Sequence, residues 1–172
     1  NMTFRFDKLT AKSQEAVAYA QSRASELGNS EIDPLHVLEG LLTDSEGIVV
    51  PLLKKLEVDV DRLRSMVQSE VERLPKVSGG REAGVGPALR TTLEAAAKAA
   101  EAMNDEFVST EHLLLGILKS DNKATGVLKL NGINQEDALQ ALQTMRGSAR
   151  VTDQHPEGKF DALSKYGIDL ID

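Results

Sequence analysis

Three histidines are the residues that by type could bind a metal ion or transfer protons: His36, His112 and His155. A metal site would need convergent ligands, and the sequence has no His-x-x-x-His motif and no cysteine. His36 and His112 instead occupy equivalent places in two similar apolar segments. Burial there favours core histidines that are satisfied by hydrogen bonds. A role in pH sensing or in binding is the alternative for both residues.

Carboxylates are the second group that could do chemistry, since paired acids serve as general acid and base. The chain has 27 of them, but no pair stands in a catalytic pattern. Glu111 is expected in the first turn of a helix, where the helix dipole favours a negative charge. Asp105 is expected in the preceding loop as a turn or cap residue, and Thr10 as a helix cap. For Glu111, binding to a partner is the alternative.

Nucleotide-binding motifs are absent. A phosphate-binding loop needs Gly-x-x-x-x-Gly-Lys-Ser/Thr, but Gly158-Lys159 is followed by Phe160. The glycines between residues 79 and 86 do not form a dinucleotide fingerprint either. A net charge of −7 without a basic run argues against nucleic-acid binding. No apolar run approaches the ~18 residues that span a bilayer, and no signal peptide is apparent. We therefore expect this fragment to have no catalytic residues, metal or cofactor.

The elements that would position these residues follow from an internal repeat. Residues 32–42 (IDPLHVLEGLL) align with residues 108–118 (VSTEHLLLGIL), 76 positions later. The same offset matches apolar positions at helical spacing upstream: Val17, Ala20, Ala24 and Leu27 with Leu93, Ala96, Ala100 and Met103. No alternating pattern predicts a strand. The sequence predicts an all-α fold in which two pseudo-symmetric four-helix repeats pack into one globular domain.

Capping residues place the helices along the chain. Thr10 is expected to begin the first helix, which runs to about Leu27. Asp33 and Asp59 are expected to cap the second and fourth, with Pro34 at the first helical position of the second. A third helix is predicted from about 48 to 56. The second half repeats this arrangement, with expected helix starts at or near Pro87, Ser109 and Asn134.

Gly40 and Gly116 lie at matched positions inside two Leu-rich segments that are apolar nearly all round. A glycine inside a helix costs roughly 1 kcal/mol relative to alanine. Close packing would explain the glycines, so we expect these two helices to meet near a pseudo-twofold axis.

Leu35 occupies the place that Glu111 fills in the other repeat. A place that accepts a carboxylate is expected to face solvent. We therefore predict that Leu35 is exposed and contributes to an apolar patch.

Two segments interrupt the repeat and suggest the domain boundaries. A Gly-rich stretch at 75–86 joins the halves, and a polar stretch at 147–156 predicts a flexible linker. We assign residues 2–146 to one domain with repeats at 8–74 and 86–146, and residues 157–172 to the beginning of a further domain. Asn1 stands before Met2, which we take as the native start.

These features resemble the Clp N-terminal domain, which precedes the AAA+ rings of ClpA, ClpC and ClpB. The resemblance covers about residues 4–147 and lies in the Pro-Leu-His and Thr-Glu-His starts and the Leu-rich bodies of the repeats. Two stretches are similar to the ClpB type: residues 73–77 (RLPKV) and residues 162–170 (ALSKYGIDL). The second is similar to the entry into the first AAA+ ATPase domain, to which we assign residues 157–172.

The resemblance implies a substrate-binding domain that captures unfolded or aggregated polypeptides for threading by the AAA+ ring of a protein disaggregase. The full-length parent would be a cytoplasmic, homohexameric ATPase that uses ATP and magnesium and works with the DnaK system. The isolated fragment would be a monomer. Family positions implicated in substrate engagement fall on Thr10, Asp105 and Glu111, and Leu93 matches a position beside the groove. Leu35 joins this candidate site from the repeat comparison.

One departure separates this sequence from ClpC. ClpC N domains tend to carry Thr-Glu-His in both halves, and those glutamates recognise phosphorylated arginine. Leu35 replaces the first glutamate here, which favours apolar segments over phosphoarginine. An adaptor-docking N domain of a Clp protease ATPase of the ClpC or ClpA type is the alternative function, and a free-standing helical enzyme is the least favoured.

Overall fold

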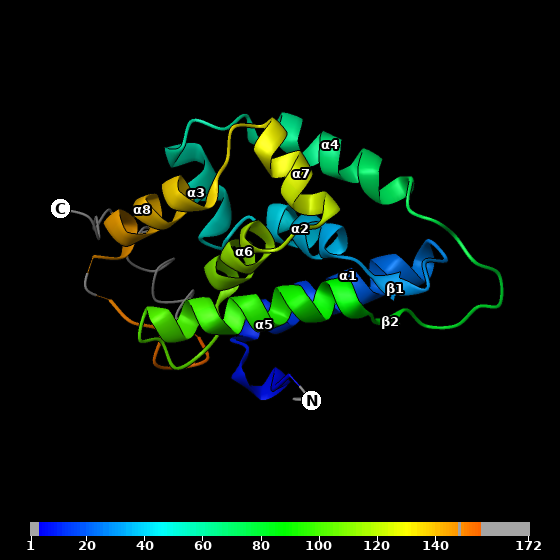
Figure 1. Ribbon diagram of the computed structural model, residues 1–172, viewed down its shortest axis with the longest axis horizontal. Coiled ribbons are helices and arrows are strands. Elements are labelled where there is room, and N and C mark those ends of the chain that lie inside the picture. Colours follow the sequence, from blue (N-terminus) through cyan, green and yellow to red (C-terminus); the bar gives the residue numbers. More distant parts are fainter. Residues whose placement is uncertain (1–3, 148, 156–172) are drawn as a thin grey trace.

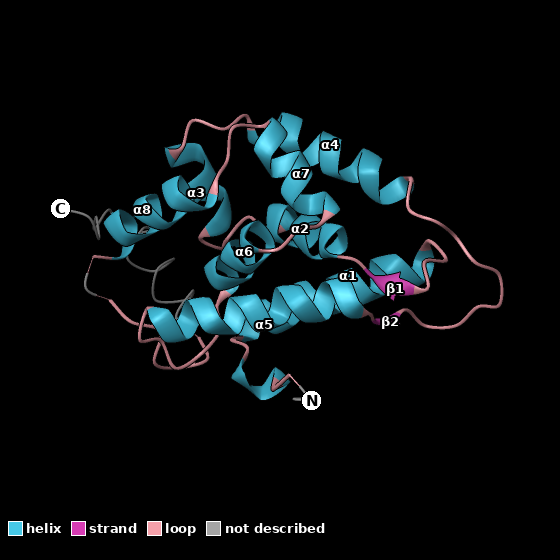
Figure 2. Ribbon diagram, viewed as in Figure 1, coloured by secondary structure: helices cyan, strands magenta, loops and turns pink. Residues whose placement is uncertain are grey.

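The protein was analysed as a computed structural model, which describes residues 4–147 and 149–155. A short 3-10 helix at Phe6–Lys8 precedes eight α-helices in this part of the chain. They are α1 (Ala11–Glu26), α2 (Pro34–Thr43), α3 (Val49–Lys55), α4 (Val60–Glu72), α5 (Pro87–Ala102), α6 (Thr110–Lys119), α7 (Lys123–Leu130) and α8 (Gln135–Arg146). The predicted all-α class is confirmed (Figure 2).

The two halves correspond helix by helix. α1 and α5 start and end 76 positions apart, and so do α2 and α6. Almost every residue of α2 and α6 is buried, and Figure 1 shows both helices near the centre, above α5 in this view. The Leu-rich segments therefore form the core, as their apolar character all round indicates.

Two short parallel pairings link the halves and repeat their symmetry. β1 (Glu31–Ile32) pairs with β2 (Gly84–Val85), and Leu9 forms an isolated parallel bridge with Val108. Leu9 and Val85 are equivalent positions in the two repeats, 76 residues apart, and so are Ile32 and Val108. The two parallel pairings are therefore related by the internal symmetry of the repeats. The sequence analysis predicted no strand, because two residues are too few to show an alternating pattern.

The predicted caps hold the ends of the helices. The side chain of Thr10 accepts a hydrogen bond from the backbone N–H of Ser13 at 3.2 Å. Asp59 and Asn134 accept in the same way at the starts of α4 and α8, and Pro34 occupies the first turn of α2. The cap predictions at Thr10, Asp59 and Asn134 are confirmed.

Gly40 and Gly116 pack differently from our prediction. A Cβ atom on Gly116 would lie 2.6 Å from the carbonyl oxygen of Thr92 and 2.7 Å from the backbone nitrogen of Ala96, both on α5. A Cβ atom on Gly40 would lie 3.0 Å from the ring of Tyr19 on α1. The lack of a side chain at each glycine therefore lets the preceding helix of the same repeat pack closely against it. The expectation that they bring α2 and α6 together is wrong.

The expected linker is partly packed onto the domain. Val151 is only 3% exposed, and its carbonyl oxygen accepts a hydrogen bond from Glu106 N at 2.8 Å. Ala11 N donates to Gln154 O, also at 2.8 Å. Residues 149–155 thus contact the loop before α6 and the start of α1, and the flexible linker at 147–156 stays a prediction. The domain boundaries stay predictions, and residues 157–172 lie outside the described residues.

Candidate functional site

All five residues of the predicted site are buried. Thr10, Leu35 and Leu93 are 0% exposed, and Glu111 and Asp105 are 4% and 8% exposed. The prediction that Leu35 faces solvent is wrong, because α2 is covered on every side by the rest of the domain. Leu93 lies in the core as well, so its side chain does not border a surface groove.

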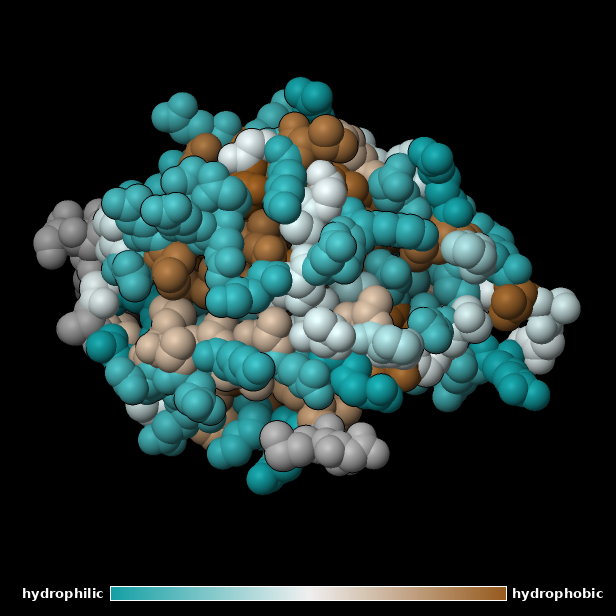
Figure 3. Space-filling view, in the orientation of Figure 1, coloured by the Kyte–Doolittle hydropathy of each residue, from teal (hydrophilic) through white to brown (hydrophobic). Residues whose placement is uncertain are grey.

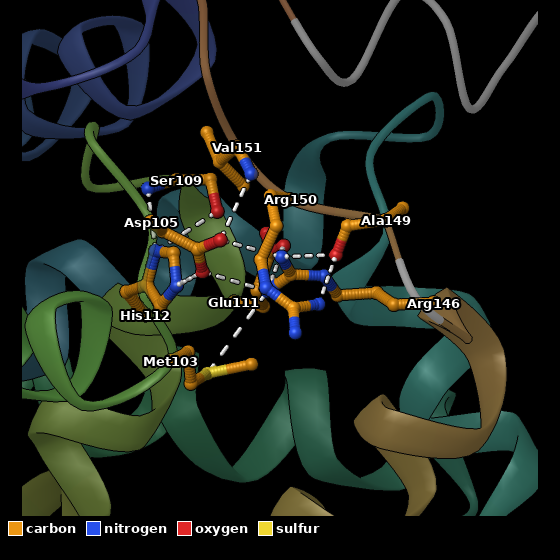
Figure 4. Close-up of polar contacts among 9 residues, drawn as sticks. All are labelled: Met103, Asp105, Ser109, Glu111, His112, Arg146, Ala149, Arg150 and Val151. Atoms are coloured by element: carbon orange, nitrogen blue, oxygen red, sulfur yellow. Dashed lines mark hydrogen bonds and ion pairs between the residues drawn. The ribbon is translucent and has the colours of Figure 1, made fainter.

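Asp105 is the centre of a buried polar network (Figure 4). Its two oxygens accept hydrogen bonds from the two terminal nitrogens of Arg146, at 2.7 and 2.9 Å. His112 Nε2 and the backbone N–H of Val151 donate to it at 2.7 and 2.8 Å. Burial alone would raise the pKa of Asp105, but the hydrogen bonds from His112 and Arg146 outweigh it and hold that pKa well below its usual range.

The two core histidines are oriented in the same way. Ser109 N donates to Nδ1 of His112 at 2.9 Å, and Asp33 N donates to Nδ1 of His36 at 2.8 Å. A backbone N–H can only donate, so Nε2 of each ring carries the proton that it shares with the residue seven positions earlier. The prediction of core histidines satisfied by hydrogen bonds is confirmed.

Only in the second repeat is the side chain that pairs with Nε2 of the histidine a charged one. His36 Nε2 contacts the neutral side chain of Asn29 at 2.9 Å, at the place equivalent to Asp105. Burial lowers the pKa of His36. The second repeat replaces Asn29 with a carboxylate and supplies Arg146 to neutralise it.

Glu111 lies beside the same network. Its Oε2 is 3.8 Å from Nη1 of Arg146, and Oε1 has no hydrogen-bond partner among the described residues. The guanidinium also reaches Sδ of Met103 at 4.0 Å. The network joins α8 to the loop between α5 and α6 and contacts Met103.

An open groove runs between α5, α6 and α8, next to Met103. It encloses about 730 Å³, within the usual range for ligand-binding clefts. Its floor is apolar and consists of Ala95, Ala99, Ala102, Met103, Leu115 and Leu139. Polar side chains form the rim: Thr91, Glu94, Lys98, Lys119, Ser120, Asp121, Gln135 and Gln143. In Figure 3, brown and pale brown atoms lie along and above α5, bordered by teal ones.

The groove is suited to binding rather than to catalysis. Two acidic and two basic side chains balance on its rim, and the apolar floor offers burial to an uncharged segment. Among the described residues, no group of three or more histidines and acids is placed to hold a metal ion. Nor is any described helix both long and apolar enough to cross a membrane.

Among the floor residues, Met103 and Leu115 were predicted from sequence as parts of apolar helices, and none was predicted to line a groove. A signal was available in the repeat itself. Ala95 and Leu115 correspond to Tyr19 and Glu39 in the first half, so small and apolar residues replace two large polar ones. Such a difference between equivalent positions marks the place where the halves diverge in shape.

A scan against protein families matches residues 8–131 to the Clp repeat N-terminal domain. The chain belongs to the Clp N-terminal domain family. It is 51% identical to the chaperone protein ClpB of Rhodopirellula baltica over 98% of its own length. It is 37% identical to ClpB of Bacillus anthracis over 96%. The chain spans about a fifth of these chaperones, 19% and 20% of their lengths.

Solved structures of Clp N domains share the fold. The N-terminal domain of Hsp104 from Candida albicans aligns with a TM-score of 0.78 and 20% identity, over 87% of this chain and 99% of that one. A ClpV N-domain in complex with a VipB peptide aligns with a TM-score of 0.66 and 22% identity, over 80% of this chain and 86% of that one. The resemblance to a ClpB-type chaperone N domain is confirmed.

Proposed function

We propose that this Clp N-terminal domain captures unfolded or aggregated polypeptides for a protein disaggregase, and that the groove between α5, α6 and α8 binds them. The observation that carries the proposal is the open apolar floor with a charge-balanced rim. Such a surface accepts many apolar segments without selecting for charge, as capture of unfolded chains requires. Peptide binding on the same fold in the ClpV–VipB complex supports it.

The buried residues of the predicted site have a supporting role in this proposal. Asp105 and Glu111 act through Arg146, which contacts Met103 at the end of the groove. Thr10 caps α1, and its backbone N–H donates to Val108 in the loop before α6. Changes at these positions would alter binding by shifting the groove, without loss of a direct contact.

The parent in this proposal is a cytoplasmic, homohexameric ATPase that uses ATP and magnesium and cooperates with the DnaK system. Its ClpB relatives are chaperones about five times as long as this chain. A groove of this size gives weak binding on its own, because association costs offset much of the buried area. Six copies on one ring would raise the effective concentration of binding sites.

A titration with a permanently unfolded, reduced and alkylated model protein tests the proposal. We expect NMR shift changes at residues of α5, α6 and α8. The variant Ala95→Glu places a charge on the apolar floor and should weaken binding at least about tenfold, equivalent to about 1.4 kcal/mol. Ala88→Glu is the matched control, since Ala88 lies on the same helix, is exposed and does not line the groove.

Two outcomes would contradict the proposal. Equal binding by the folded Ala95→Glu variant would show that the groove is not the site. If the parent domain binds no unfolded protein at millimolar concentration, capture of unfolded chains is wrong, and docking of a specific adaptor becomes the better function. The ClpV–VipB complex joins a defined peptide to a Clp N domain, so it is consistent with this second candidate as well as with the first.

A further inference from the structure

The domain has two equivalent halves, but the groove between α5, α6 and α8 is lined by residues of the second half alone. Four positions that line the groove are Thr91, Ala95, Lys119 and Ser120. Their equivalents in the first repeat line a hollow of only about 180 Å³, against about 730 Å³ for the groove. These equivalents are Glu15, Tyr19, Thr43 and Asp44. The small hollow is therefore what remains of the same groove in the first half.

Three residues occupy the missing volume, and we call them the plug: Tyr19, Arg23 and Glu39. Glu39 is 1% exposed, and its Oε1 accepts hydrogen bonds from Tyr19 Oη and Arg23 Nε, both at 2.9 Å. Arg23 Nη2 also donates to Oε2 at 3.4 Å. Burial, together with the hydrogen bond to Glu39, raises the pKa of the Tyr19 hydroxyl, so it remains a donor.

The second repeat lacks all three plug residues. Alanines, Ala95 and Ala99, stand at the places of Tyr19 and Arg23, and Leu115 stands at the place of Glu39. All three line the floor of the groove. Gly40 leaves room for the plug, since the ring of Tyr19 packs directly on this glycine.

We infer that the plug restricts peptide binding to the second repeat, by filling in the first repeat the position that the groove occupies in the second. This inference rests on the proposed function and adds to it that each domain binds one apolar segment. A domain with two open grooves would bind two segments and hold them more tightly by avidity. The plug therefore limits each domain to one bound segment, which dissociates readily.

Transplanting residues between the repeats tests the inference in both directions. Tyr19→Ala, Arg23→Ala and Glu39→Leu together give the first repeat the residues of the second. We expect this variant to bind two copies of a short apolar peptide that carries one tryptophan. The domain contains no tryptophan, so peptide fluorescence reports binding directly, and NMR locates the second copy on α1 and α2.

The reverse transplant, Ala95→Tyr, Ala99→Arg and Leu115→Glu, installs the plug in the second repeat. We expect at least a tenfold loss of peptide affinity while the circular dichroism of the domain is unchanged. It also keeps the inference testable if the first variant fails to fold.

Stoichiometry separates the two ideas. A folded first variant that still binds one peptide overturns the role of the plug and leaves the proposed function standing. A folded reverse variant with the affinity of the parent overturns both the plug and the groove as the binding site, because its substitutions lie on the groove floor. If the parent binds no peptide, both are overturned. Two bound copies in the first variant, with new shifts confined to α1 and α2, establish the plug as the determinant of single binding.

Discussion

Asp105 and Asn29 hold equivalent histidines, yet only Asp105 carries a charge. A buried carboxylate is stable only when a partner offsets the cost of its desolvation. Arg146 provides that partner through two hydrogen bonds, and Val151 adds a third. Asn29 needs no such partner, and its side-chain amide donates to the carbonyl oxygen of Pro75. The second repeat has thus exchanged a neutral contact for an ion pair that ties α8 to the loop before α6.

Removing this charge should destabilise the domain strongly. Asp105→Asn leaves the buried guanidinium of Arg146 with the more distant Glu111 as its charged partner, so we expect a loss of about 3 kcal/mol in the free energy of unfolding. Urea denaturation followed by circular dichroism measures it. Asp121→Asn, which alters an exposed acid, should change stability by less than about 0.5 kcal/mol. A similar effect for both variants would contradict the role of the network.

The same carboxylate predicts how stability depends on pH. The pKa of Asp105 is lower in the folded domain than its ordinary value, which is about 3.9 in an unfolded chain. Its contribution is therefore complete above about pH 5 and is lost as the pH falls below about 4. We expect Asp105→Asn to flatten the pH dependence of unfolding below pH 5 relative to the parent. Parallel curves for parent and variant would show that other acids dominate.

At the scale of helices, the two glycines differ in what they touch. A Cβ atom on Gly116 would lie 2.6 and 2.7 Å from backbone atoms of α5, which cannot move without shifting the helix. One on Gly40 would lie 3.0 Å from the ring of Tyr19 and 3.3 Å from the carbonyl oxygen of Ala16, so it needs a smaller adjustment. We expect Gly116→Ala to cost about 1–3 kcal/mol through overpacking and Gly40→Ala to cost less. Thermal unfolding of the two variants measures the difference.

Gly126 supplies the control for helix propensity. It lies inside α7 with nothing within 4 Å of its added Cβ atom. Gly126→Ala should stabilise the domain by up to about 1 kcal/mol. If Gly116→Ala proved as stabilising as Gly126→Ala, the close approach of α5 and α6 would be wrong.

The helices themselves could be predicted from sequence because their signals are local. A cap such as Thr10 and a proline such as Pro34 act within one turn, and an offset of 76 positions identifies equivalent helices. Burial is not local, and this is why the prediction for Leu35 failed. Glu111 is buried despite its charge because Arg146, 35 positions later, lies 3.8 Å away. Repeat alignment equates positions, but it does not show which distant side chain compensates each one.

The groove could not be predicted for a related reason at the scale of the whole molecule. Its lining comes from α5, α6 and α8, between Thr91 and Gln143, and only the fold brings these helices together. What the sequence does contain is the divergence between the repeats at Ala95, Ala99 and Leu115. Only the structure relates these differences to a groove, because it shows that the larger equivalent residues of the first half occupy the corresponding volume.

Each half of the domain closes with a segment that folds back on its own loop. After α4, Val77 N donates to Gly28 O at 2.8 Å. After α8, Val151 contacts Asp105 and Glu106 in the equivalent loop. Residues 149–155 therefore pack on the second repeat in the way that residues 75–77 pack on the first, so we expect the domain to extend beyond the end of α8.

Shortening the chain tests whether this segment belongs to the domain. A fragment that ends at Gly147 loses the burial of Val151 and two backbone hydrogen bonds, from Glu106 and Ala11. Removing buried apolar surface and hydrogen bonds lowers the stability of the folded state. We therefore expect the fragment to unfold at a lower urea concentration than one that ends at His155. Its Asp105 loop should also exchange amide hydrogens faster, since Val151 no longer covers it. Equal stability and equal exchange in the two fragments would show that residues 149–155 contribute nothing to the fold and would restore the domain end at residue 146.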